Sequence, residues 1–280
     1  MVYLVTFANK AFYESQAELE KSALKYGVDQ VLKYNEDDLI MTDFFKEHKT
    51  ILTKRKGAGY WLWKPYYIYK TLKKINTNDT LVYLDAGISV TDDIGVLVEV
   101  CRNTEQKCML FTNQTHKNSQ YTKGDCFFIM DCKDEKYSES FQIDASVQVY
   151  AKCERTLRLV KEWLDYCTNP LLLTDCKNHY VYSNYPDFED HRHDQSILSL
   201  LAVKYELDIF RDPSQWGDYL KMTPYRSDKD YLPLSYATIP LLNSPYGTLL
   251  NHHRKRDVSM TDKIAFHLER LYKKYVVRYI

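Results

Sequence analysis

The stretch Arg55–Val90 reads RKGAGYWLWKPYYIYKTLKKINTNDTLVYLDAGISV, and the fold prediction starts from it. Thr80–Leu84 (TLVYL) is a continuous apolar run, which is typical of a strand buried inside a parallel sheet. Lys64-Pro65 opens a helix-like segment, because proline is tolerated in a first helical turn. The apolar run stops at Asp85. The stretch therefore predicts a helix followed by a buried strand that ends in a carboxylate.

The rest of the chain alternates between strand-like and helix-like segments. Further strands are predicted at Val2–Phe7, Gln30–Tyr34, Met109–Thr112, Cys126–Met130 and Ser146–Tyr150. Further helices are predicted from Ala11 to a stop at Gly27, and at Asp43–His48, Glu154–Cys167, His193–Tyr205 and Thr261–Tyr275. Thr168–Asp190 is predicted to be a long loop near a site. This order predicts one α/β domain over residues 1–280, with a mixed, mostly parallel sheet flanked by helices.

Composition excludes several classes of protein. The chain has 38 Lys and Arg against 38 Asp and Glu, and its one short basic cluster is His252–Arg256, so a nucleic-acid protein is not expected. Seven cysteines without paired spacing indicate reduced thiols in a reducing compartment. The first residues lack the pattern of a signal peptide, and no apolar run is long enough to span a bilayer. We expect a cytoplasmic protein.

Asp85 is placed where a ligand would bind, because ligands of open α/β sheets lie outside the carboxyl ends of the strands. Ala86 and Gly87 follow it and are small enough for close approach. Three cations and two glycines precede the strand, namely Arg55, Lys56, Lys64, Gly57 and Gly59. Cations, glycine backbone and a helix start suit a diphosphate. The alternative is that Asp85 is only a turn or capping residue.

The order GYW-x-WKP, helix, LVYLDAG resembles nucleotide-sugar-dependent glycosyltransferases of the GT-A type. Gln142–Ser146 (QIDAS) resembles the segment of that family that faces the sugars. His191–Ser196 (HRHDQS) resembles its Asp-Gln helix start near the reacting sugar. The combination, over about residues 1–205, is similar to small glycosyltransferases of large DNA viruses (chlorovirus-like) and of bacterial polysaccharide clusters.

The resemblance implies a GT-A-like fold with a nucleotide-binding half at 1–90, and an acceptor half with a C-terminal helix at 91–280. It implies transfer of a hexose or pentose from a nucleoside-diphosphate sugar to a hydroxyl of a glycan. A UDP-sugar is the expected donor, and UDP-xylose is one option. It also implies a divalent cation, Mn²⁺ or Mg²⁺. No nucleic acid partner is expected, and the oligomeric state stays open.

The resemblance also implies roles for single residues. The donor-binding residues would be Thr6, Arg55, Tyr60, Lys64, Asp85, Ala86 and Gly87. The sugar- and acceptor-binding residues would be Asp144, Ala145, His193 and Gln195. One departure matters, because Gly87 stands where the family has the second aspartate of Asp-x-Asp. The metal ligands would then be Asp85 and His252.

An inverting transfer needs one carboxylate as general base, to take the proton of the attacking hydroxyl. Asp144 and Asp194 are the two candidates. Asp194 is preferred because a helix start would fix its orientation and keep it ionised.

The sequence leaves other interpretations open, namely a hydrolase, a purely structural role for Asp194, and a binding module. His191, His193 and Asp194 could instead hold the metal of a hydrolase, since imidazole and carboxylate ligands suit transition metals. Asp194 could also be no more than the N-cap of its helix. The missing second aspartate favours a third possibility, a non-catalytic carbohydrate-binding module with the same fold.

Overall fold

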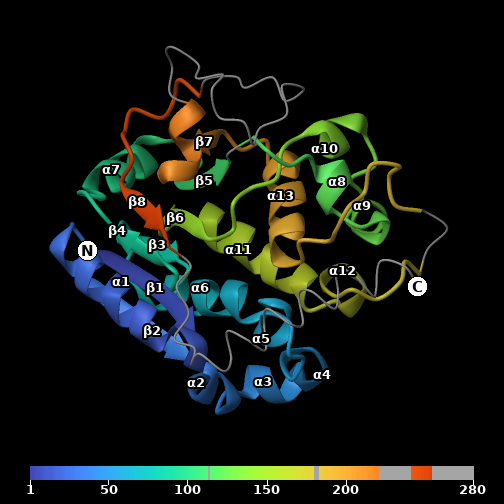
Figure 1. The fold of residues 1–280 in the computed structure, drawn as a ribbon, viewed down its shortest axis with the longest axis horizontal. Helices are drawn as coiled ribbons and strands as arrows, with labels where there is room; N and C mark the ends of the chain where they lie inside the picture. The colour runs from blue at the N-terminus through green and yellow to red at the C-terminus, as the bar shows by residue number, and fades with distance from the viewer. Residues whose placement is uncertain (113, 180–182, 221–240, 254–280) are drawn as a thin grey trace.

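A six-stranded sheet forms the centre of the computed structural model, which describes residues 1–112, 114–179, 183–220 and 241–253 (Figure 1). The strand order is β2-β1-β3-β6-β5-β7. The strands are β1 (Val2–Ala8), β2 (Gln30–Asn35), β3 (Thr80–Leu84), β5 (Cys108–Thr112), β6 (Val147–Ala151) and β7 (Ile209–Arg211). Strand β6 is antiparallel to both of its neighbours, and the other pairings are parallel. The prediction of a mixed, mostly parallel sheet is confirmed.

Both faces of the sheet are buried, which explains why its inner strands are mostly apolar. All five residues of β3 are buried. Leu81 and Tyr83 belong to one hydrophobic core, and Val82 and Leu84 belong to the other. Because side chains alternate along a strand, each face contributes to its own core.

Helices cover the two faces (Figure 1). The first core packs α6 (Trp63–Lys74), α11 (Glu154–Cys167) and α13 (Asp194–Lys204) on one face. The second core packs α1 (Tyr13–Lys25) and α7 (Gly95–Asn103) on the other. The shorter helices are η1 (Lys10–Phe12), α2 (Glu36–Ile40), α3 (Asp43–Glu47), α4 (Lys49–Leu52), α5 (Gly57–Tyr60), α8 (Asn118–Tyr121), α9 (Gly124–Ile129), α10 (Glu135–Glu139), α12 (Pro170–Leu173) and η2 (Gln215–Leu220).

A second, two-stranded sheet joins distant parts of the chain. Strand β4 (Ile88–Val90) pairs with β8 (Leu250–His252) in antiparallel register, with Ile88 opposite His252. The N–H of His253 donates to the carbonyl of Gly87 at 3.0 Å. The segment that carries His252 therefore lies directly beside the loop that follows β3.

One predicted strand is wrong. Cys126–Met130 lies largely in helix α9. Cys126, Phe127 and Met130 are buried, a spacing of one and four that fits a helix rather than the alternation of a strand. The predicted loop Thr168–Asp190 contains the short helix α12, and the predicted helix Thr261–Tyr275 lies outside the described residues.

No helix in the described ranges is long and apolar enough to cross a membrane. All seven cysteines are free thiols.

Candidate functional site

Three aspartates meet at the edge of the sheet where the parallel strands end. Asp85 follows β3, and Asp212 follows β7. Asp144 comes shortly before β6, whose start lies at this edge because β6 runs antiparallel. The N–H of Asp144 donates to the carbonyl of Phe111 at 2.7 Å, and the N–H of Asp212 donates to that of Thr112 at 3.0 Å. Strand direction thus brings together carboxylates that are far apart in the sequence.

Lys64, Asp85 and Asp194 form what we call the lysine cluster. Lys64 lies in the first turn of α6 and is only 3% exposed. Its Nζ lies 3.4 Å from Asp85 Oδ1 and 3.3 Å from Asp194 Oδ2. It also donates a hydrogen bond to the carbonyl of Ala145 at 3.2 Å. One buried ammonium group therefore binds two carboxylates from different elements.

Burial controls the charge of Asp194, which is 3% exposed. Its pKa is raised to about 6: burial is the main cause of the rise, the charge of Lys64 opposes it, and the charge of Asp85 adds to it. Burial acts to lower the pKa of Lys64, but Asp194, Asp85 and Asp144 outweigh it and the pKa is raised. Desolvation dominates this pKa, and the backbone N–H of Gln195 at the helix start lowers it only by a smaller amount. The capping alternative is wrong, because His193 is the N-cap and Asp194 is the first helical residue.

Tyr83 orients Asp85. Its hydroxyl donates to Asp85 Oδ1 at 2.5 Å, and burial raises the pKa of Tyr83 well above its usual value. The phenol therefore stays protonated and remains a donor. The side chain of Asp85 is 37% exposed, against 5% for that of Asp194. Asp85 is the member of the lysine cluster that a ligand can reach most easily.

Asp144, Asp212 and His252 form a second group, which we call the histidine cluster. Their candidate ligand atoms all lie within 4.8 Å of one another, and His252 Nε2 is 4.0 Å from Asp144 Oδ2. Asp144 Oδ1 accepts hydrogen bonds from the N–H and hydroxyl of Ser146, and Asp212 Oδ1 accepts one from the N–H of Ser214. The Oδ2 atoms of both aspartates are buried and lack a hydrogen-bond partner in the described part of the chain. Two such oxygens beside an imidazole fit a divalent cation.

Ring packing and hydrogen bonds hold His252 in place. The His252 ring stacks on Trp216, with ring centroids 3.8 Å apart and planes at 17°. Gln215 bonds both backbone groups of His252. Burial raises the pKa of Asp212 to about 7, and the charge of Asp144 adds to the rise. Anionic groups held together away from water favour a bound cation.

The predicted metal pair is only partly present in this arrangement. His252 is in the histidine cluster, whereas Asp85 lies in the lysine cluster. Asp144, predicted to bind a sugar hydroxyl, is a candidate metal ligand. Asp212 was missed altogether, although it directly follows a strand as Asp85 does.

The other residues predicted to bind the donor lie in varied surroundings. Thr6 is fully buried in β1, and Ala86 is buried beside Asp85. Tyr60 is half-buried and Arg55 is exposed. A Cβ on Gly57 would lie 2.4 Å from the Trp61 ring, and one on Gly59 would lie 2.6 Å from Leu52 Cα. These glycines therefore allow close packing within the protein, and the approach of a ligand to their backbone stays a prediction.

The residues predicted near the acceptor are mostly engaged with other protein groups. Gln195 Nε2 donates to Gln142 Oε1 at 3.1 Å. His193 Nδ1 lies 2.8 Å from the carbonyl of Leu173, and His191 Nε2 lies 2.7 Å from that of Leu172. In the described residues, His191, His193 and Asp194 are not a group that could hold a metal ion. The hydrolase alternative therefore lacks its metal centre there.

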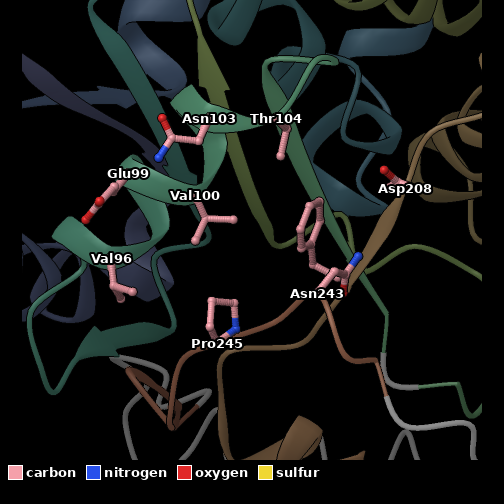
Figure 2. Close-up of a pocket in the computed structure, with 9 residues that line it drawn as sticks. Val96, Glu99, Val100, Asn103, Thr104, Asp208, Asn243 and Pro245 are labelled. Carbon is pink, nitrogen blue, oxygen red and sulfur yellow. The ribbon is translucent and has the colours of Figure 1, made fainter.

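A hollow of about 430 Å³ lies elsewhere, between α7 and the segment around Asn243 and Pro245 (Figure 2). Val96, Val100 and Glu99 of α7 line one side of it. It lies beside the start of β7, whereas the two clusters lie beyond the strand ends. None of the six cluster residues lines it.

Comparisons with known proteins give similarity at the level of structure. No family model matches the chain, and no curated protein matches it. Mouse xyloside xylosyltransferase 1 matches 91% of this chain over 98% of its own, at 10% identity and a TM-score of 0.44. The bifunctional glycosyltransferase WbbM matches 90% of this chain over 45% of its own, at 13% identity and a TM-score of 0.48. The galactosyltransferase LgtC, solved with donor and acceptor sugar analogues, matches 90% of this chain over 87% of its own, at 15% identity and a TM-score of 0.39.

At these TM-scores the function has to be inferred from the residues of the site itself. The expected similarity to viral enzymes stays a prediction.

Proposed function

We propose that this protein is a glycosyltransferase that moves a sugar from a nucleoside-diphosphate sugar to a hydroxyl of a glycan. The observation that supports it best is the meeting of the lysine and histidine clusters at the carboxyl edge of the sheet. Ligands of open α/β sheets bind at this edge. A UDP-sugar is the donor we favour, and UDP-xylose is one option among several.

The two clusters suggest a division of work along the chain. Lys64 and Asp85 come from residues 1–90, which we assign to the nucleotide-binding half. Asp144, Asp194 and Asp212 come from residues 91–280, which we assign to the acceptor half. Asp85, the most exposed member of the lysine cluster, would contact the donor. Lys64 would act mainly by holding Asp85 and Asp194, since its ammonium group is buried against them.

In the proposed reaction, the acceptor hydroxyl attacks the anomeric carbon of the donor. A glycosidic bond forms as the bond from that carbon to the diphosphate oxygen breaks, and the diphosphate departs with the bonding electrons. Asp194 takes the hydroxyl proton as general base. With a pKa of about 6, its carboxyl group is largely ionised at neutral pH and still basic enough for this role. Attack opposite the leaving group inverts the anomeric centre.

Asp144, Asp212 and His252 would hold a divalent cation, with Mn²⁺ or Mg²⁺ as the candidates. Oxygen-rich ligand sets suit both ions, and the imidazole favours Mn²⁺. Bound there, the cation would neutralise charge on the departing diphosphate. Asp85, predicted as a metal ligand from the sequence, binds Lys64 and Tyr83 through Oδ1 and lies outside the candidate ligand group, so we assign it to the donor.

A non-catalytic module is the rival function that the missing second aspartate suggested. The histidine cluster weakens this alternative, because it supplies two carboxylates and an imidazole without a residue at Gly87. A carbohydrate-binding module has no need of a buried carboxylate with a raised pKa.

The direct test is a panel of nucleotide sugars, with and without Mn²⁺, read by thermal unfolding and then by product formation with glycan acceptors. A bound ligand at about 100 times its dissociation constant should stabilise the fold by about 2.7 kcal/mol. We expect one UDP-sugar to stabilise the protein, more strongly with Mn²⁺, and to be consumed. Stabilisation by free glycans alone, with no nucleotide effect, would support the binding module instead.

A further inference from the structure

Two segments with unusual backbone geometry meet behind the lysine cluster. Five consecutive residues, Gly57–Trp61, have positive φ, with values of 57°, 48°, 94°, 56° and 59°. His193 has φ 57° and ψ −119°. For residues other than glycine such angles cost of order 1–3 kcal/mol each, and they persist only where surrounding contacts enforce them. Contacts around both segments must therefore enforce these backbone angles.

The two segments contact each other. The His193 ring lies 5.0 Å from that of Tyr60 and is stacked on that of Trp61 at 5.4 Å and 22°. Lys64 follows Trp61 by three residues, and Asp194 follows His193 directly. The aromatic contact thus lies immediately before both members of the 3.3 Å ion pair.

A hydrogen bond anchors the His193 ring from the other side. A carbonyl can only accept, so Nδ1 must carry the proton that it donates to Leu173 at 2.8 Å. Burial lowers the pKa of His193, which keeps the ring neutral at physiological pH. The residue is 3% exposed. Its ring faces the protein interior and is poorly placed to hold a sugar hydroxyl, the role predicted from the sequence.

We propose that His193 is a positioning residue for Asp194. The Leu173 bond and the Tyr60–Trp61 contact hold its backbone at this positive φ, and this sets the angle at which the chain enters α13. If φ relaxed to an ordinary negative value, the Asp194 carboxylate would be redirected away from Lys64. The inference rests on the proposed function only in giving Asp194 the role of base.

The test compares His193→Ala with His193→Asn and with His191→Ala as matched control. Alanine loses the anchor and disfavours positive φ. Asparagine accepts the positive φ of a primed turn more readily than alanine does, and its side-chain amide can donate to Leu173. His191 is equally buried, makes a similar bond to Leu172 and contacts the His193 ring at 5.0 Å, but it is not among the residues with positive φ, so it controls for lost packing against His193. All three proteins would be measured for kcat, for donor KM, and for labelling of Lys64 by an amine reagent, read by mass spectrometry.

We expect His193→Ala to lower kcat by roughly 10²-fold, as misplacement by about 1 Å can, with donor KM nearly unchanged. Lys64 should become labelled. His193→Asn should recover most of the kcat and keep Lys64 protected. His191→Ala should lose stability but keep both kcat and the protection of Lys64.

Two results would overturn the inference. One is an unchanged kcat with Lys64 still protected in His193→Ala. The other is an equal loss of both in His191→Ala, which would make both histidines merely structural. If the wild-type protein transfers no sugar, the proposed function fails, yet the labelling still decides whether His193 holds the Lys64–Asp194 pair.

Discussion

The lysine and histidine clusters differ in how their negative charge is balanced. In the lysine cluster, a buried ammonium lies between two carboxylates, at 3.4 and 3.3 Å. In the histidine cluster, two aspartates and an imidazole gather their ligand atoms within 4.8 Å, and the pKa of Asp212 rises to about 7 through burial and the charge of Asp144. The first cluster carries its own cation, and the second is suited to receive one. One edge of the sheet can thus hold both a fixed base and an exchangeable metal.

A short backbone segment links the two clusters. Asp144 belongs to the histidine cluster, and the carbonyl of the next residue, Ala145, accepts the hydrogen bond from Lys64. Binding of a ligand at one cluster should therefore affect the geometry of the other. The following predictions test the division of roles between them.

The largest effect is expected from Asp194→Asn. This change keeps the shape of the side chain but removes the base, so turnover should fall by roughly 10²–10⁴-fold. Donor affinity, measured by calorimetry, should barely change. Near-normal turnover, or a product that NMR shows to keep the donor's anomeric configuration, would remove Asp194 from the proposed mechanism.

Lys64→Ala should be the most destabilising change in the site. From the sequence alone, this substitution would be expected to weaken donor binding with little change in melting temperature. The structure predicts otherwise, because removing one partner of a buried ion pair costs about 3–5 kcal/mol. Denaturant unfolding measures this loss in the free energy of unfolding. The loss should be larger at about pH 8 than at about pH 5, since Asp194 can take up a proton below its pKa of about 6.

Lys56→Ala is the control for charge alone. Lys56 forms an exposed pair with Asp175 at 3.0 Å, and losing such a pair costs about 1 kcal/mol or less. Equal losses in the two variants would mean that burial does not distinguish Lys64.

Asp212→Asn should abolish metal-linked stabilisation. In the wild type, Mn²⁺ at about 100 times its dissociation constant should add about 2.7 kcal/mol, and binding should tighten when a nucleotide diphosphate supplies further oxygens. Asp208→Asn is the matched control, since Asp208 lies before β7 in the hollow of Figure 2. If Asp85→Asn removes the metal effect and Asp212→Asn does not, the metal belongs to Asp85 and His252, as the sequence predicted.

The smallest effect is the pH dependence. A base must be ionised, so kcat/KM should fall about tenfold per pH unit below the pKa of Asp194, which is about 6. The sign for stability is opposite: a raised pKa means that the native fold binds the proton more tightly than the unfolded chain does. That contribution is fully present below the usual value of 3.8 and is lost as the pH rises through about 6. An acidic limb of kcat/KM near pH 4 would show that a different carboxylate titrates.

Local patterns were sufficient for much of the fold. Thr80–Leu84 and Glu154–Cys167 were predicted with the bounds that the structure has, because a fully buried strand and an amphipathic helix leave clear periodicity. Cys126–Met130 was not, since a short apolar run of five residues fits either state and only its packing decided for a helix.

The sequence by itself determined that Asp85 would stand at a strand end, that Lys64 would open a helix, and that His252 was a candidate metal ligand. The first two follow from local pattern, and the third from the resemblance to GT-A glycosyltransferases. Only the tertiary structure decided that Asp144 and Asp212 join His252, because their meeting depends on the antiparallel direction of β6 and on strand order. The raised pKa of Asp194 was also beyond the sequence, since desolvation depends on everything that surrounds a group in space and not on its neighbours in the chain.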